Sequence, residues 1–330
     1  MLQKKLGNGD LKTSQMGLGC MGMSEFYGEK NDEESLKTLD RALELGITFW
    51  DTADAYGPFT NEILVGKSLK NKRDKITLAT KFGIVRDPSD ASKRSFSGKP
   101  DYVKTACEAS LKRLGTDVID LYYLHRVDAS TPIEDTVGAM AELVKEGKIK
   151  AIGLSEVSSS TLLKVHKNVH PITALQTEYS LWSREPEDGL LETCKENNIS
   201  FVAYSPLGRG FLTGQLKKFE DFEANDYRRF SPRFQGSNFE KNLNLVSKLQ
   251  EIAVEKNCTI SQLALAWVLA QGDHIFPIPG TKKIKYLEDN SKAVDIKLTS
   301  SDLNKISAVF PRESVAGDRY PANMMGTINK

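Results

Sequence analysis

Short apolar runs alternate with amphipathic helical segments along almost all of this 330-residue sequence. The runs that indicate β-strands cover residues 15–18, 48–51, 76–81, 119–124, 150–154, 172–176, 200–204 and 274–277. Helical spacing of apolar residues covers 32–45, 60–70, 101–114, 133–146, 158–167, 188–197, 260–271, 283–291 and 300–309. Strands that alternate with helices predict a parallel sheet with crossover helices. The whole pattern predicts an α/β fold, a (β/α)₈ TIM barrel.

Four segments lie outside this alternation. Residues 4–12 contain a Gly-Asn-Gly-Asp turn, which predicts an N-terminal hairpin. Residues 208–239 are too many for an ordinary strand-to-helix loop, and we expect them to form a functional loop over the site. An extra helix is predicted over 240–257. The tail, 311–330, is expected to be irregular and to fold over the mouth of the barrel.

Composition narrows the class of protein. The length fits one barrel domain over residues 1–330, and the formal net charge of +1 gives no electrostatic reason to expect nucleic acid or an anionic membrane as partner. The first residues lack the apolar region of a signal peptide, and no apolar run is long enough to cross a bilayer. The cysteines are scattered, which favours reduced thiols and a cytoplasmic protein. They are Cys20, Cys107, Cys194 and Cys258.

Four polar residues lie at or just after the ends of three consecutive predicted strands. Asp51, Lys81 and His125 each end an apolar run, and Tyr56 follows Asp51 by five residues. The carboxyl ends of the strands are where a barrel of this kind keeps its catalytic groups. A tyrosine, a lysine, an aspartate and a histidine gathered there suit proton transfer to a carbonyl oxygen.

Two other carboxylates compete with this interpretation. Asp51 together with Asp54 or Asp128 resembles the acid pair of a glycosidase. Acidic residues in loops are, however, more often helix caps and turn formers, so we expect a structural role for Asp54 and Asp128. The sequence has no HExxH, His-x-x-His or cysteine cluster, and no metal site is predicted.

The sequence segments around these residues resemble those of the aldo-keto reductases, most closely the bacterial, plant and fungal aldehyde-reductase branch. The resemblance rests on GITFWDTADAYG, LATKFG, DLYYLHRVD, KIKAIGLSEVS, AYSPLGRGFLTG and PIPGTK. It runs from Met16 to about Asn290, nearly the whole chain. In that family the N-terminal hairpin closes the bottom of the barrel. The resemblance implies reduction of an aldehyde or ketone to an alcohol by hydride transfer from NADPH.

The resemblance also implies a role for each of the four polar residues. Tyr56 is expected to act as the general acid, although the pKa of an unperturbed tyrosine is about 10. The Lys81 ammonium favours the phenolate and is expected to lower that pKa, with Asp51 holding Lys81 in place. Neutral His125 is expected to orient the carbonyl.

The dinucleotide is expected in an extended groove across the barrel mouth. No GxGxxG opens a helix after the first strand, so a Rossmann domain is not supported. Ser155 and Gln176 match the carboxamide contacts of the family, and Tyr204 matches the residue that stacks beneath the nicotinamide. The resemblance assigns the remaining contacts to Met21, Gly22, Asp51, Ser205, Leu207, Gly208, Gly210, Gly280, Thr281, Lys282, Tyr286, Asp289 and Asn290.

The choice of NADPH over NADH follows from the start of the last barrel helix. Lysines oppose the positive end of a helix dipole, so their presence around Lys282 makes more sense if a 2′-phosphate binds there. The sequence departs from the family pattern twice. Glu156 stands where many members have Asn, which puts one amide contact to the carboxamide in doubt. Tyr286 stands where many have Arg, which leaves the phosphate to Lys282.

Tyr27, Phe82, Trp182 and the 208–239 loop are expected to line a pocket for a small carbonyl substrate, with apolar or aromatic aldehydes favoured and a pyridoxal-like aldehyde conceivable. The alternative function is a cofactor-binding regulatory subunit with little turnover, as potassium-channel β subunits of this superfamily are. Those subunits keep the four polar residues, so the tetrad does not separate the two. A hydrolase on the same barrel is the third possibility, because a fold does not fix a function. The sequence predicts no particular oligomeric state.

Overall fold

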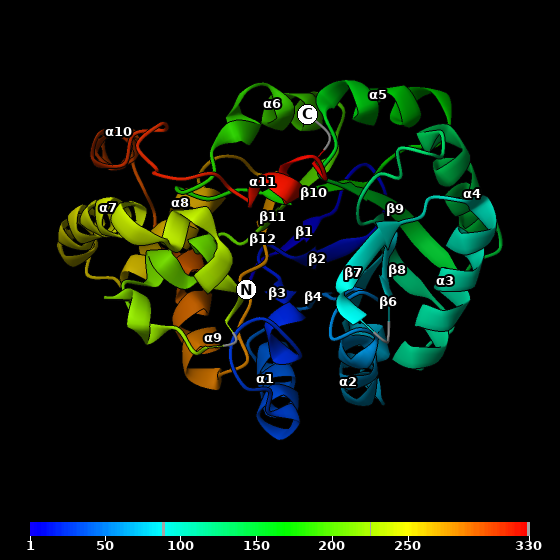
Figure 1. The fold of residues 1–330 in the computed structure, drawn as a ribbon. Helices are drawn as coiled ribbons and strands as arrows, with labels where there is room; N and C mark the ends of the chain where they lie inside the picture. The colour runs from blue at the N-terminus through cyan, green and yellow to red at the C-terminus, as the bar shows by residue number, and fades with distance from the viewer. Residues whose placement is uncertain (88–89, 225, 329–330) are drawn as a thin grey trace.

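A parallel eight-stranded sheet forms the centre of the computed structural model, which describes residues 1–87, 90–224 and 226–328 (Figure 1). Its strands are β3 (Leu18–Gly19), β4 (Phe49–Asp51), β5 (Thr77–Phe82), β8 (Ile119–Leu124), β9 (Ile149–Ser155), β10 (Ala174–Glu178), β11 (Ser200–Tyr204) and β12 (Ile275–Pro277). Neighbours pair in chain order from β3 to β12. The helices between the strands supply the long crossovers that parallel pairing requires.

Backbone contacts between the first and last strands close the sheet. The amide of Gly17 donates to the carbonyl of Pro277 at 2.9 Å, and Gly19 bridges Gly280 in parallel. A Cβ on Gly280 would lie 3.2 Å from the carbonyl oxygen of Gly19. The glycines therefore permit a close approach of two backbones, and the (β/α)₈ barrel predicted from the alternation is confirmed.

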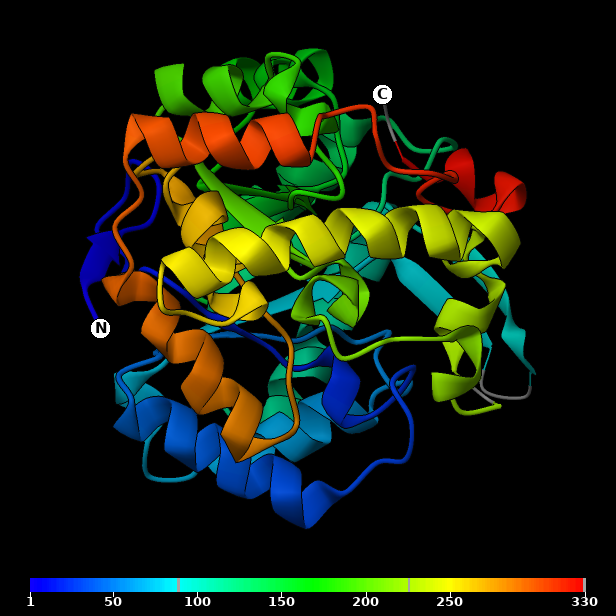
Figure 2. The same ribbon diagram turned by 90° about the vertical axis from the view of Figure 1, so that its left-hand side faces the viewer.

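Helices surround the sheet (Figure 2). They are α1 (Asp32–Glu44), α2 (Thr60–Leu69), α3 (Pro100–Leu114), α4 (Ile133–Lys145), α5 (Ser159–Asn168), α6 (Leu190–Glu196), α7 (Gly236–Glu255), α8 (Ile260–Leu269), α9 (Ile284–Ser291), α10 (Ser300–Val309) and α11 (Ala322–Met325). Side chains cap several of them: Asn31 accepts from the amide of Glu34, and Thr259 forms a capping box with Gln262. No helix in the described part of the chain is long and apolar enough to span a membrane.

Two apolar layers follow from the alternation of side chains along each strand. The inner layer fills the barrel with Phe49, Ala79, Leu121, Tyr123, Ala151, Ala174, Val202 and Phe276. The outer layer joins the sheet to the helices and includes Leu78 and Tyr122. On β9, a Cβ on Gly153 would lie 2.3 Å from the ring of Tyr123, so the glycine makes room for an aromatic plug. The closed interior restricts ligands to the strand ends.

Two hairpins lie outside the barrel. The predicted one is present as β1 (Gln3–Lys5) and β2 (Lys12–Ser14), and Leu6 in its turn packs into the inner layer, which closes the bottom of the barrel. The second, β6 (Ile84–Asp87) with β7 (Asp90–Phe96), was not predicted. It follows β5 directly and stands beside the site, because Arg86 donates to the carbonyl of Ala55 at 3.3 Å.

Some predicted boundaries were wrong. The first strand begins at Leu18 rather than at residue 15, because the chain bends at Gln15 and Met16 after the hairpin. The segment after β11 is a chain of short 3₁₀ turns: η4 (Gly208–Thr213), η5 (Phe219–Asp221), η6 (Tyr227–Phe230) and η7 (Pro232–Phe234). The extra helix α7 begins at residue 236, four residues before the predicted start. Further 3₁₀ turns are η1 (Met21–Met23), η2 (Arg73–Lys75), η3 (Glu185–Glu187) and η8 (Lys292–Asp295).

Candidate active site

The four polar residues predicted from the strand ends converge at the mouth of the barrel. Asp51 is the last residue of β4, Lys81 lies near the end of β5, and His125 follows β8 directly. The turn that carries Tyr56 is tied to β5, because the amide of Asp54 donates to the carbonyl of Lys81 at 3.0 Å. This backbone hydrogen bond brings Tyr56 close to Lys81, although the two residues are far apart in the sequence.

Lys81 is the centre of the cluster and is fully buried. Its ammonium donates to Oδ1 of Asp51, to the carbonyl of Thr52 at 2.8 Å and to the hydroxyl of Tyr56 at 3.2 Å. Gln176 donates to the other carboxylate oxygen of Asp51 at 2.8 Å. A buried charge is stable only if it is paired and hydrogen-bonded, and each group here meets that condition. Since Lys81 donates to the tyrosine oxygen, the phenolic proton is left to point elsewhere.

His125 completes the cluster from the neighbouring strand. Its ring lies edge-on to that of Tyr56, with centroids 5.7 Å apart and an angle of 85° between the planes. Its amide donates to the carbonyl of Phe82 at 2.8 Å, which fixes the backbone there. Within the described residues, the buried Nδ1 atom has no hydrogen-bond partner. The ring is therefore positioned by packing and remains available to a ligand.

The pKa values define the resting protonation states. Burial raises the pKa of the Tyr56 hydroxyl, and the opposing charge of Lys81 does not outweigh it. The predicted net lowering of this pKa is therefore wrong in sign: burial dominates, and Tyr56 is a protonated phenol at neutral pH. Burial, followed by the charges of Arg126 and Lys81, lowers the pKa of His125 well below 6.5, so its ring is neutral. Burial lowers the pKa of Lys81, but the stronger effect of Asp51 and Tyr56 raises it, so the net pKa is raised and the ammonium stays charged.

The competing carboxylates have structural surroundings. Asp128 accepts from the amides of Gly98 and Ser130 at 3.0 and 2.8 Å, which is the pattern of a loop cap. Although burial opposes it, this hydrogen bonding lowers the pKa of Asp128 to about 2. Burial and the nearby Glu62 raise the pKa of Asp54. Asp51 is itself bound to Lys81 and Gln176, so the hydrogen bonds of both Asp51 and Asp128 are those of structural carboxylates rather than of a general acid.

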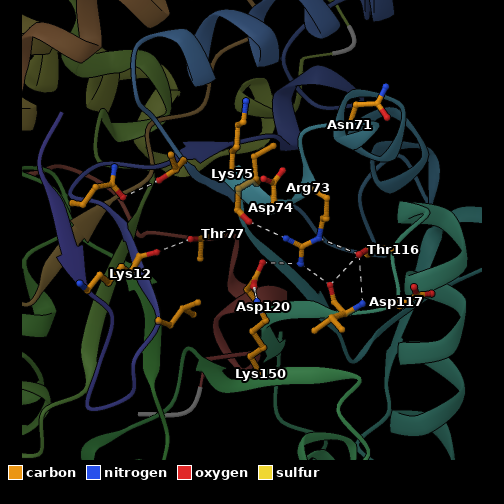
Figure 3. Close-up of a pocket in the computed structure, with 15 residues that line it drawn as sticks. Lys12, Asn71, Arg73, Asp74, Lys75, Thr77, Thr116, Asp117, Asp120 and Lys150 are labelled. Atoms are coloured by element: carbon orange, nitrogen blue, oxygen red, sulfur yellow. Dashed lines mark hydrogen bonds and ion pairs between the residues drawn. The ribbon is translucent and has the colours of Figure 1, made fainter.

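A hollow of about 690 Å³ lies at the opposite end of the barrel (Figure 3). Asp120 at its wall accepts from the amide of Leu78 at 2.8 Å and pairs with Arg73 and Lys150, each at 2.7 Å. These contacts join the N-terminal ends of neighbouring strands. In barrels of this kind that face serves stability, whereas chemistry belongs to the other end. We therefore assign the hollow no part in the reaction.

Comparison with known proteins identifies the architecture. The model of the aldo/keto reductase family matches residues 15–310. This chain belongs to the aldo/keto reductase family. It is 47% identical over 323 residues to the aldo-keto reductase yakc [NADP(+)] of Schizosaccharomyces pombe, with 96% of this chain and 94% of that protein covered. Members of the family are oxidoreductases, and the resemblance seen in the motifs is confirmed.

Solved structures of aldo-keto reductases superpose on the chain. Glycerol dehydrogenase AKR11B4 from Gluconobacter oxydans has a TM-score of 0.85 at 28% identity, with 94% of this chain and 96% of that one covered. Aldo-keto reductase AKR11C1 from Bacillus halodurans, in its holo form, has a TM-score of 0.78 at 30% identity, with 94% and 97% covered. The agreement extends over nearly the whole length of each chain, so the (β/α)₈ fold is that of the family.

The residues that the resemblance assigns to the nicotinamide end lie on β9, β10 and β11. Ser155 accepts from Arg126 at 3.2 Å, and Gln176 is bound to Asp51. Tyr204 shares a hydroxyl–hydroxyl hydrogen bond of 2.8 Å with Tyr320 of the tail. The three residues therefore lie on neighbouring strands, and Gln176 contacts the tetrad through Asp51.

The segment after β11 carries the residues assigned to the pyrophosphate. Gly208 and Gly210 have φ of +54° and +90°, so glycine suits both positions. Between them, one guanidinium nitrogen of Arg209 is buried without a hydrogen-bond partner among the described residues. Buried N–H donors in proteins are nearly always hydrogen-bonded, and a bound anion would accept a hydrogen bond from this one. Ser205 and Leu207 precede this turn, and Met21 and Gly22 lie in η1. The donor set here fits a phosphate group.

Lys282 contacts the loop after β3 rather than standing free. Its ammonium donates to the carbonyl of Tyr27 at 2.8 Å and to that of Glu29. Thr281 accepts from the amide of Lys283 at 3.1 Å, just before α9, and Tyr286 is exposed. The remaining residues of this end are Gly280, which bridges Gly19, Asp289, which accepts from Gln262 and Thr259, and buried Asn290.

The predicted substrate pocket needs one correction. Phe82 is fully buried and stacks on Tyr122 in the outer layer, with centroids 4.8 Å apart. The side chain after Lys81 must face away from the barrel interior, because neighbours on a strand alternate. Trp182 is also buried, against Phe211. Tyr27 lies beside the 208–239 segment, where the guanidinium of Arg228 covers its ring at 5.1 Å.

A group of charged residues at the mouth was not predicted from the sequence. Arg126, Glu178 and Arg319 lie with Glu156 around the end of β9, and Tyr320 joins them from the tail. The available signal was the same one that found the tetrad: Glu156 and Glu178 also stand at strand ends. No such indication exists for Arg319, because it does not follow a predicted strand.

The lowered pKa of His125 predicts a pH-dependent stability. Below pH 6.5 His125 is protonated in the unfolded chain but stays neutral in the native protein. Protonation therefore favours the unfolded state, and the free energy of unfolding decreases as pH falls from 6.5 towards the lowered native pKa. The loss is at most about 1.4 kcal/mol per pH unit. Urea unfolding between about pH 5 and 7 should show a steeper dependence on pH in wild type than in His125→Gln, which keeps the contributions of His166 and His274, whose pKa values burial also lowers. His170→Gln is the control; a pH-independent gap between wild type and His125→Gln would contradict the assignment.

Proposed function

We propose that this protein is an NADPH-dependent reductase of aldehydes, and of ketones, to alcohols. The observation that carries the proposal is the contact between the Lys81 ammonium and the Tyr56 hydroxyl, inside a buried cluster that Asp51 and Gln176 complete. The name of the yeast relative, which includes NADP(+), and the holo form of the Bacillus halodurans structure support the choice of cofactor.

Reduction of a carbonyl needs a hydride on carbon and a proton on oxygen. A bound reduced nicotinamide supplies the hydride. Tyr56 then donates its phenolic proton to the carbonyl oxygen, and the Lys81 ammonium stabilises the phenolate that remains. Asp51 holds that ammonium in place. Neutral His125 donates a hydrogen bond to the same carbonyl oxygen and so favours the developing negative charge.

The cofactor would lie along the barrel mouth. Ser155, Gln176 and Tyr204 would hold the nicotinamide end, and Gly208, Gly210 and Arg209 would meet the pyrophosphate. Lys282 would hold the 2′-phosphate, with Gly280 and Thr281 beside it. Ser205, Leu207, Met21, Gly22, Tyr286, Asp289 and Asn290 complete the proposed contacts. The substrate would enter beside Tyr27, under the 208–239 segment. The free cysteines suit action in the cytoplasm.

Tyr56→Phe tests the proposal directly. The variant removes only a hydroxyl, so NADPH binding should be kept, whereas aldehyde reduction should fall by about 10²–10⁴-fold. Turnover is measured with a panel of aldehydes, and binding by the fluorescence of NADPH. Turnover within a factor of a few of wild type would remove Tyr56 from the role of acid. Wild-type protein that binds NADPH and reduces none of the panel would favour the regulatory-subunit alternative.

Lys282→Ala tests the choice of cofactor. Loss of a charge-assisted contact to the 2′-phosphate should weaken NADPH binding by about 1.5–3 kcal/mol and leave NADH binding nearly unchanged. Lys292→Ala, at an exposed site just beyond α9, is the matched control. Lys282 also holds the carbonyls of the loop after β3, so equal losses for NADPH and NADH would show that it acts on that loop instead.

A further inference from the structure

The tail after α10 is held at the mouth of the barrel by specific contacts (Figure 1). The side chain of Asn242 on α7 donates to the carbonyl of Ala316 and accepts from its amide, both at 2.9 Å. Arg233 donates to the carbonyl of Gly317 at 3.2 Å. These bonds fix the two residues that lead into Arg319, so the tail approaches the strand ends in a defined register.

Arg319 then reaches three different strand ends with one guanidinium. It donates to Oε2 of Glu178 at 2.9 Å, to the hydroxyl of Tyr204 at 2.8 Å and to Oε1 of Glu156. Glu156 and Glu178 are buried, Tyr204 is half-buried, and Arg319 itself is only 7% exposed. The fork of a guanidinium suits such a junction, because it presents several donors in fixed directions.

The two carboxylates do not depend on Arg319 equally. Glu178 also pairs with Arg209 at 3.3 Å and Arg233 at 3.9 Å. Among the described residues, Glu156 makes its ion pair with Arg319. Loss of Arg319 would remove this ion pair and leave the buried Glu156 carboxylate with the amide of Glu178 and the charge of Arg126, which is more costly than loss of a surface pair.

Glu156 in turn fixes the backbone next to the residues proposed for the nicotinamide. It has φ of +54°, an uncommon conformation for a residue other than glycine. Its amide donates to the carbonyl of Gln176 at 3.1 Å, and its carboxylate accepts from the amide of Glu178, also at 3.1 Å. The Glu156 carboxylate therefore ties the end of β9 to that of β10, one residue beyond Ser155.

We propose that Arg319 is a positioning residue for the nicotinamide end of the cofactor. It sets the position of Ser155 and Gln176 through Glu156, and that of Tyr204 through its hydroxyl. Tyr320 reinforces the last contact with its own hydroxyl, 2.8 Å from that of Tyr204. The inference rests on the proposed function, since it concerns the same groove. It assigns to the tail a part in cofactor binding.

The test compares two ligands that share only the adenine end. NADPH and adenosine 2′,5′-bisphosphate are titrated by calorimetry into wild type, Arg319→Met and the control Arg312→Met. Arg312 lies at the start of the same tail and pairs with Asp188 on the surface. Arg319→Met should raise the dissociation constant of NADPH by roughly tenfold or more. The bisphosphate should bind all three proteins alike, because it has no nicotinamide.

Each outcome decides the matter. NADPH binding by Arg319→Met within twofold of wild type, or an equal loss for both ligands, would overturn the inference. If Arg319→Met does not fold, as judged by circular dichroism, the same criteria apply to Arg319→Lys, which keeps the charge and loses the fork, and to Tyr320→Phe, with a few-fold loss expected for NADPH alone. Wild-type protein that does not bind NADPH would overturn the proposed function itself, which separates the two failures.

Discussion

The buried ion pair between Lys81 and Asp51 is the interaction on which the site depends. A charged ammonium fully out of water is tolerated only because Asp51, Thr52 and Tyr56 accept all that it donates. Gln176 binds the other oxygen of Asp51, so the pair also joins β4 and β5 to the far side of the barrel. The same contacts that make the lysine stable place it on the tyrosine oxygen, so stability and chemistry share one set of bonds.

A second charged group around Glu156 and Glu178 organises the opposite wall of the mouth. Burial alone would raise the pKa of Glu178, yet Arg319, Arg209 and Arg233 lower it to about 2, so the carboxylate is ionised throughout the physiological range. Its partners come from the segment after β11 and from the tail. The carboxylates lie at the ends of barrel strands, and the cations come from the segment after β11 and from the tail, so these ion pairs hold both segments at the mouth of the barrel.

Much of the fold and the tetrad could be predicted because both rest on local patterns. Apolar strands separated by helical spacing define the barrel, and a polar residue at a strand end, such as His125, must face its mouth. The prediction that Phe82 lines the substrate pocket was wrong, because side chains alternate along β5 and that of Phe82 points away from the side where Lys81 lies. The β6–β7 hairpin and Arg319 were missed because neither belongs to the alternation of barrel strands and helices. Their positions depend on tertiary contacts, such as that of Arg86 with the carbonyl of Ala55, which no local pattern encodes.

The central claim is that Lys81 makes Tyr56 a competent acid in spite of burial. The pH profile of single-turnover aldehyde reduction, measured in wild type and Lys81→Met with NADPH bound, tests it most directly, because cofactor release does not enter a single turnover. Loss of the cation leaves burial unopposed, so the account predicts slower reduction and a profile displaced towards higher pH in Lys81→Met. A folded, NADPH-bound Lys81→Met protein that kept the rate and profile of wild type would contradict it.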